Sequence, residues 1–139
     1  QPFFVLLNFW MSSIQLSLAL ASKEPQKLSE FYAFATNGDL HSGMNSNHFL
    51  ITHSNSFRLQ VYCPSGKSSW SHRGRGRASA LCLQQVPSSN PLLAIGEWVD
   101  TLLSRGAVVV DHPKLEPFGA EAWLTDPDGN YFLVFVPKN

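Results

Sequence analysis

The sequence predicts an α+β fold built from two similar modules, each with the order strand, helix, then about three strands (βαβββ). After Met11 the sequence contains an internal repeat, in which two successive halves have the same kinds of segment in the same order. The two closing segments, Leu59–Pro64 and Phe132–Pro137, alternate in the same way and both end in proline, at an offset of 73 residues (132 − 59). A repeat of this kind indicates two copies of one unit that share a core.

Each half begins with a strand and continues with a helix. Gln15–Leu20 and Ala78–Leu83 alternate as strands do. The helices are expected to begin near Pro25 and Pro91, because proline fits the first turn of a helix. Apolar residues then recur at helical spacing until a glycine marks the end. The further strands are predicted at residues 47–52, 108–110 and 120–125.

Charge and composition exclude several classes of function. The 139 residues carry ten Lys and Arg against ten Asp and Glu, so the net charge is zero. The broad basic field of a nucleic-acid-binding protein is therefore missing. A 44% apolar share excludes disorder along most of the chain. Cys63 and Cys82 form neither a disulfide framework nor a zinc motif, and we expect buried thiols in a cytoplasmic protein.

Two segments stand apart from the repeat, so the predicted organisation has four parts. These are an apolar extension (residues 1–12), the first module (13–64), a basic Gly/Ser-rich linker (65–77) and the second module (78–137), the two modules forming one domain. The extension is too short to span a membrane and lacks the basic start of a signal peptide. It is interpreted either as sequence upstream of an initiating Met11 or as an element that packs on the domain or on a partner, with a membrane-associated segment as a third interpretation. The linker is either solvated or a clamp for an anionic ligand through Arg73, Arg75 and Arg77.

The string Asp126-Pro127-Asp128-Gly129-Asn130 predicts a tight hairpin, because proline presets one backbone angle and glycine tolerates positive φ. Together with the two βαβββ halves and the pair Phe31-Tyr32 in the first helix, this hairpin resembles the vicinal-oxygen-chelate superfamily. That group includes glyoxalase I, extradiol dioxygenases and bleomycin-resistance proteins, and the resemblance covers roughly residues 13–137. It implies a half-barrel of two curled sheets around a ligand site, with the helices outside, and a homodimer.

The resemblance also implies where a metal would bind. Enzymes of the superfamily hold a divalent metal with one ligand from the first strand and one from the last strand of each module, usually His or Gln and then Glu. Here those positions fall on Gln15 or Ser17, on Gln60, on one of residues 78–80 and on Leu133. Because none of them is a histidine or a carboxylate, and neutral amides alone bind divalent ions poorly, we expect no metal and no cofactor.

Strand alternation then predicts what faces the cavity of the second module. If Leu133 faces it, Tyr131 and Phe135 share that face. Trp123 matches a position at which relatives often place an aromatic residue against the ligand. These side chains predict a site for a small hydrophobic or aromatic molecule. The alternative is that the aromatic side chains fill the space of the lost metal site and leave no cavity.

The same alternation turns Arg58, Gln60 and Tyr62 inward in the first module. A buried amide such as Gln60 needs hydrogen-bonding partners and often marks a wet site. Arg58 suggests an anionic group on the ligand, unless it pairs with an acidic residue at a sheet edge.

Three functions follow from these expectations. The first is a metal-free protein that binds a small molecule, in the manner of bleomycin-resistance proteins, without nucleic-acid or membrane partners. The second is an enzyme, either a metal-dependent lyase or dioxygenase or a metal-free enzyme that uses Gln60 and Tyr62. The third is a dimeric interaction module with a filled cavity, in which the apolar Phe3–Met11 segment serves assembly.

Overall fold

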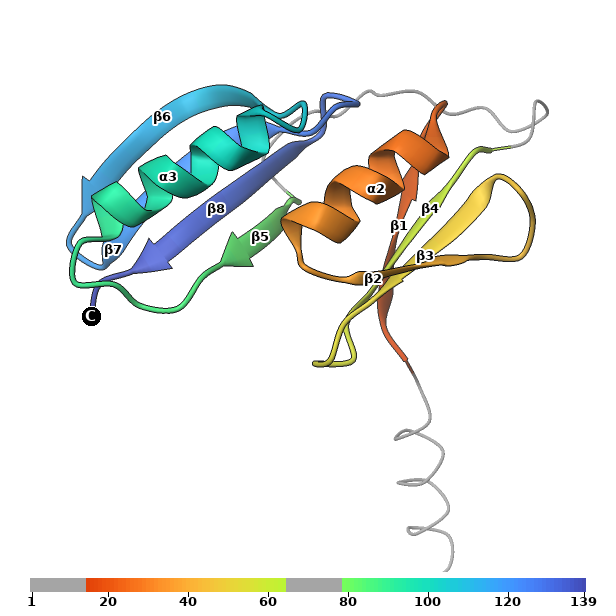
Figure 1. The fold of residues 1–139 in the computed structure, drawn as a ribbon, viewed down its shortest axis with the longest axis horizontal. Coiled ribbons are helices and arrows are strands. Elements are labelled where there is room, and N and C mark those ends of the chain that lie inside the picture. The colour runs from red at the N-terminus through yellow and green to blue at the C-terminus, as the bar shows by residue number, and fades with distance from the viewer. Residues whose placement is uncertain (1–14, 65–78) are drawn as a thin grey trace, which may run out of the picture.

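The computed structural model describes residues 15–64 and 79–139 of the chain (Figure 1). The first module contains β1 (Ser17–Ala21), α2 (Pro25–Ala35), β2 (Asp39–Ser42), β3 (His48–Thr52) and β4 (Arg58–Tyr62). The second contains β5 (Leu81–Gln84), α3 (Pro91–Leu103), β6 (Val108–Glu116), β7 (Gly119–Thr125) and β8 (Tyr131–Pro137). Both modules have the βαβββ order, which confirms the predicted fold class.

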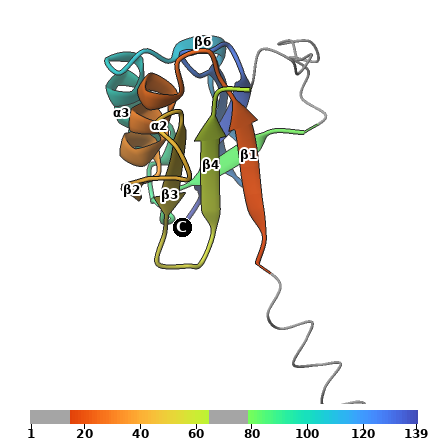
Figure 2. The ribbon, with the colours of Figure 1, turned by 90° about the vertical axis from the view of Figure 1, so that its right-hand side faces the viewer.

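Each module forms its own four-stranded sheet, and the two sheets have the same topology. The strand orders are β1-β4-β3-β2 and β5-β8-β7-β6. In both sheets the first strand pairs in parallel with the last, and the remaining pairs are antiparallel. Both helices lie on the same side of the sheets, and the opposite face carries no helix (Figures 1 and 2). We call this opposite side the helix-free face.

The helices begin where local chemistry favours a helix. Proline occupies the first turn of both, where its missing N–H is no loss. In α3 the side chain of Asn90 caps the first turn by accepting a 3.3 Å hydrogen bond from the Leu93 amide. Beyond the end of α3, Gly106 has a φ of 108°, a conformation that favours glycine.

The core lies between each helix and its sheet. Alternate residues of β4 and β8 are buried there, while their neighbours are partly exposed on the helix-free face. The helices contribute residues at three- and four-residue spacing, such as Leu28, Phe31 and Tyr32 of α2. The aromatic rings of Phe31, Tyr32 and Phe132 contact one another, with centroids 5.1 to 6.1 Å apart, and join the two modules.

Some predictions differ from the structure. The edge strand β2 was not predicted, because its sequence Asp-Leu-His-Ser is mostly polar and all four of its residues are in contact with solvent. β6 is longer than predicted, and irregularities in its register with β7 carry it past Pro113. The expectation of buried thiols is wrong. Cys63 is half-buried, and Cys82 is exposed because it lies on edge strand β5 and pairs in register with Leu133 of the helix-free face.

The expectations for residues 1–12 and for the linker at 65–77 lie outside the described residues. Within the described ranges, neither helix is long and apolar enough to cross a membrane.

Candidate functional site

A cavity of about 510 Å³ lies where the first strands of the two sheets approach each other. Its walls come from both modules, so we call it the seam cavity. Leucines of β1, Phe57 and Leu81 make it mainly apolar, and hydroxyl and amide groups add a few polar points. Its volume is in the usual range for a small-molecule site. The lining residues are Leu16, Ser17, Leu18, Leu20, Tyr32, Phe57, Ser79, Ala80, Leu81, Asn130 and Tyr131.

The exposed leucines of the seam cavity follow from the place of β1 at the edge of its sheet. Leu18 and Leu20 lie in register with the buried Leu59 and Val61 of β4 and therefore point to the core side. Leu18 nevertheless remains 36% exposed and Leu16 79% exposed. The first strand thus presents apolar side chains to the cavity.

The predicted ligand-binding residues divide between the two sheets. Register and burial place Arg58, Gln60 and Tyr62 on the helix-free face of β4. They place Trp123, Tyr131, Leu133 and Phe135 on the helix-free face of β7 and β8. Of the seven, Tyr131 alone lines the seam cavity.

A second cavity, of about 570 Å³, lies over β6 and β7 and includes Trp123. Asp111, Lys114 and Glu121 give it a charged character that differs from that of the seam cavity. The structure therefore places Trp123 and Tyr131 in different cavities. Phe135 instead contacts Phe118, with ring centroids 5.6 Å apart.

A directional chain of hydrogen bonds crosses the helix-free face of the first module and ends at the seam cavity. The backbone N–H of Met44 donates to Nδ1 of His48 (2.8 Å), so the neutral imidazole carries its proton on Nε2. His48 Nε2 then donates to Oε1 of Gln60 (2.9 Å), and Gln60 Nε2 donates to Oγ of Ser17 (2.8 Å). We call this chain the Ser17 relay.

The strand register shows which first-strand residues lie beside Gln60 and Leu133, two of the metal-ligand positions that the resemblance implies. Ser17 contacts Gln60, and Ala19, two residues later, is the register partner of Gln60. In the second module Cys82 is the register partner of Leu133, which makes Ala80 the counterpart of Ser17. With this register, the four positions that the resemblance implies fall on Ser17, Gln60, Ala80 and Leu133.

These four residues do not fit a divalent metal. Ala80 and Leu133 have no donor atom, and the amide oxygen of Gln60 already accepts a hydrogen bond from His48. Transition metals and Mg²⁺ need several oxygen, nitrogen or sulfur ligands, with anionic groups to balance the charge. No cluster of three or more His, Cys, Asp or Glu residues that could hold a metal occurs within residues 15–64 and 79–139.

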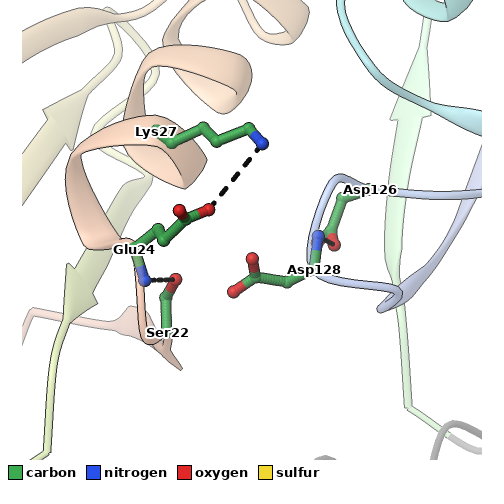
Figure 3. A network of polar contacts seen from close by, with 5 residues as sticks. All are labelled: Ser22, Glu24, Lys27, Asp126 and Asp128. Atoms are coloured by element: carbon green, nitrogen blue, oxygen red, sulfur yellow. Dashed lines mark hydrogen bonds and ion pairs between the residues drawn. The ribbon is translucent and has the colours of Figure 1, made fainter.

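The hairpin between β7 and β8 connects the second module to the first. Asp126 closes the turn by accepting hydrogen bonds from the amides of Asp128 and Asn130 and from the Asn130 side chain. Its Oδ2 also accepts a 2.6 Å hydrogen bond from the Tyr32 hydroxyl. Figure 3 shows Asp126 and Asp128 on this turn, beside the start of α2 at Glu24 and Lys27. The predicted hairpin is confirmed, and Gly129 adopts a φ of 87° within it.

Burial shifts the pKa values of the hydrogen-bonded pair Asp126 and Tyr32. It raises the pKa of Asp126, although the hydrogen bonds from Tyr32 and Asn130 oppose the rise. It also raises the pKa of Tyr32 well above 10.0, and the negative charge and hydrogen bond of Asp126 act in the same direction. Tyr32 therefore remains a protonated donor at neutral pH.

Sequence reasoning missed two side chains of this site. His48 is one of five histidines in the sequence and was not among the predicted site residues, although it is 9% exposed and hydrogen-bonds Gln60. The signal was available, since alternation from Ile51 places His48 on the face opposite to the core. Tyr32 was recognised as part of a helix, but no local pattern could predict a partner 94 residues away.

Comparisons with known proteins agree with this architecture. No protein-family model matches the sequence, and no curated protein sequence matches it significantly. Similar solved structures include a glyoxalase/bleomycin resistance protein/dioxygenase family enzyme from Burkholderia phytofirmans PsJN. That similarity has a TM-score of 0.68 and 14% identity, and covers 87% of this chain and 96% of the other.

Two further structures are similar at low sequence identity. TnmS3, an antibiotic binding protein from Streptomyces sp. CB03234, has a TM-score of 0.60 and 21% identity, with 91% of this chain and 97% of that chain covered. Lactoylglutathione lyase from Agrobacterium tumefaciens has a TM-score of 0.56 and 16% identity, with 89% and 93% covered. The resemblance read from the sequence is thus supported, and the chain has the two-module fold of the glyoxalase/bleomycin resistance/dioxygenase proteins.

Proposed function

We propose that this protein binds a small, partly hydrophobic or aromatic molecule in the seam cavity, without a metal. The observation that carries the proposal is the apolar cavity itself, which is of ligand size and opens where the two modules meet. The unsuitable residues at the four metal-ligand positions support the metal-free mode. TnmS3, which has a similar fold and is described as antibiotic-binding, provides a precedent for small-molecule binding on this architecture.

Arg58, Gln60, Tyr62, Trp123, Leu133 and Phe135 remain predicted ligand-binding residues, as part of this proposal. They share the helix-free face that borders the cavity, and Gln60 reaches it through Ser17. A ligand larger than the seam cavity would extend over this face. The homodimer, the cytoplasmic location and the lack of nucleic-acid partners likewise stay predictions.

The alternative of a metal-free enzyme that uses Gln60 and Tyr62 stays a prediction, and Ser17 does not add an activated nucleophile to it. A serine nucleophile needs a neighbouring base that accepts its proton. In the Ser17 relay the direction is the reverse, because Gln60 donates to Ser17 and His48 carries its proton toward Gln60. For the metal-dependent lyase or dioxygenase, the test is elemental analysis of the purified protein. About one equivalent of metal per chain would favour the enzyme and contradict the metal-free proposal.

The proposal can be tested with N-phenyl-1-naphthylamine, a neutral fluorescent probe of apolar sites. Leu18→Trp should weaken probe binding at least tenfold, because a larger side chain on β1 fills the cavity that Leu18 lines. Leu40→Trp is the matched control, since Leu40 is 38% exposed on β2, at the other edge of the same sheet. Equal affinity for all three proteins, or no binding to the unmodified protein, would contradict the proposal.

A further inference from the structure

The seam cavity has no charged side chain among the described residues that line it, whereas the cavity over β6 and β7 has several. An ionised group placed between its leucines would lose hydration without gaining a partner of opposite charge. The cavity therefore suits a neutral molecule. The polar residues among those that line it are Ser17, Ser79, Tyr32, Tyr131 and Asn130.

Two of these residues, Tyr32 and Asn130, already donate hydrogen bonds to Asp126. Tyr32 donates its hydroxyl hydrogen to Asp126, and the side-chain amide of Asn130 donates to both oxygens of the same carboxylate. The Tyr32 hydroxyl can therefore offer a ligand only oxygen lone pairs, whereas the Asn130 amide keeps its carbonyl oxygen and a second N–H. Ser17 differs, because its oxygen accepts from Gln60 and its hydroxyl hydrogen has no acceptor among residues 15–64 and 79–139.

The direction of the hydrogen bond between Gln60 and Ser17 is fixed by the other members of the relay, His48 and Met44. If the Gln60 amide were turned over, its NH₂ group would meet the Nε2–H of His48, and two donors would face each other. His48 cannot exchange its tautomer to relieve this, because Nδ1 accepts the backbone N–H of Met44. A hydroxyl that accepts a hydrogen bond also becomes a stronger donor, since bonds in a chain polarise one another.

We propose that Ser17 determines the specificity of the seam cavity. It acts as a hydrogen-bond donor held in that state by Met44, His48 and Gln60, so the cavity takes a neutral, mainly apolar molecule that carries a carbonyl oxygen. This inference rests on the proposed function and names the chemical class of its ligand. His48 and Gln60 are positioning residues that act through Ser17.

The test compares two neutral naphthalene probes on the full-length protein. The probe 6-propionyl-2-dimethylaminonaphthalene carries a ketone, and its emission moves to longer wavelength when the ketone accepts a hydrogen bond. N-phenyl-1-naphthylamine has no carbonyl group. Ser17→Ala should weaken binding of the ketone probe about fivefold, equivalent to about 1 kcal/mol, and shift its bound emission to shorter wavelength. Binding of the second probe should stay within about twofold.

A second variant removes the donor without removing the serine. In Gln60→Glu one carboxylate oxygen still accepts from His48, and the other takes the Ser17 hydroxyl hydrogen. The ketone probe should therefore lose affinity and shift its emission as it does in Ser17→Ala. Ser79→Ala tests the other serine hydroxyl of the same cavity, which lies outside the relay. Ser104→Ala is the matched control, because it removes an exposed hydroxyl at the end of α3, away from the cavity, and it should leave both readouts unchanged.

The outcomes separate this inference from the proposed function. If neither probe binds the unmodified protein, the proposed function fails and the specificity falls with it. If both probes bind and Ser17→Ala leaves the ketone affinity and emission unchanged, the assignment of Ser17 is overturned while the cavity stands. A loss caused by Ser79→Ala but not by Ser17→Ala would overturn it in the same way.

Discussion

The hydroxyl of Tyr32 in α2 donates a 2.6 Å hydrogen bond to Oδ2 of Asp126, which lies in the other module and 94 residues further along the chain. Both side chains are buried. Tyr32 and Asn130, which both hydrogen-bond Asp126, also line the seam cavity. The contact that docks the two modules therefore also shapes the wall of the proposed ligand site.

Replacement of Tyr32 by phenylalanine should destabilise the protein. The ring contacts with Phe31 and Phe132 would remain, but the Asp126 carboxylate would lose a donor in a buried place. Hydrogen bonds to charged groups contribute more than neutral ones, so the free energy of unfolding should fall by about 2 kcal/mol. Urea titration measures this change.

Tyr62→Phe is the control for this substitution, because Tyr62 is 38% exposed on β4. Removal of the Tyr62 hydroxyl group should change the free energy of unfolding by less than about 0.5 kcal/mol. Equal effects of the two substitutions would show that the bond between the modules contributes nothing to stability.

Tyr32→Phe also tests how the stability of the protein depends on alkaline pH. Because the pKa of Tyr32 is well above 10.0 when folded, the folded protein holds this proton over a range in which the unfolded chain releases it. Raising the pH through that range favours unfolding. The stability advantage of the unmodified protein over Tyr32→Phe should be constant between about pH 7 and pH 10 and shrink above pH 10, since the other tyrosines are common to both. An advantage that stays constant to about pH 11 would contradict the raised pKa.

Gly43→Ala should disrupt the Ser17 relay. A Cβ atom at residue 43 would lie 1.9 Å from Nδ1 of His48, so the imidazole would have to move away from Met44 and Gln60. The free energy of unfolding should fall by about 1–3 kcal/mol. In the ¹⁵N spectrum of the histidine rings, His48 should lose the signature of a single Nε2–H tautomer.

Gly96→Ala provides the opposite control within α3. Nothing lies within 4 Å of a Cβ atom at this residue, and alanine favours a helix interior over glycine. It should stabilise the protein by about 0.5–1 kcal/mol and leave the His48 spectrum unchanged. An intact His48 signature in Gly43→Ala would mean that the relay does not depend on this close approach.

The exposed thiol of Cys82 gives a fourth prediction. In Cys63→Ser it is the remaining thiol, and it should react with a disulfide reagent in the folded protein. Partial desolvation of the exposed Cys82 side chain, and to a lesser extent Glu121, raise the pKa of the thiol above 9.0, so the reaction rate should keep rising beyond that pH. A thiol that reacts only after denaturation would show that Cys82 is buried, as the sequence had suggested.

Local patterns in the sequence predicted most of the fold. The strands β4 and β8 alternate cleanly, and the proline at the start of each helix and the turn at Asp126–Asn130 are where their residue types predict them. Strand β2 could not be predicted, because an exposed edge strand has no buried side to impose alternation. Alternation also assigned the correct faces to Gln60 and Leu133.

Patterns of this kind could not predict which side chains meet. Alternation gives the face of a strand, but not the distance between faces of different sheets. Trp123 and Tyr131 share a face and nevertheless line different cavities. The contacts of Ser17 with Gln60 and of Tyr32 with Asp126 join residues 43 and 94 positions apart, so they arise only when the modules are folded and docked.

The most direct test of small-molecule binding in the seam cavity is a ¹H–¹⁵N NMR titration of the full-length protein with N-phenyl-1-naphthylamine. The account predicts saturable shift changes at the amides of Leu18, Leu81 and Tyr131, on the three strands that line the cavity. Changes centred instead on Asp111 and Trp123, or no saturable change at any amide, would contradict it.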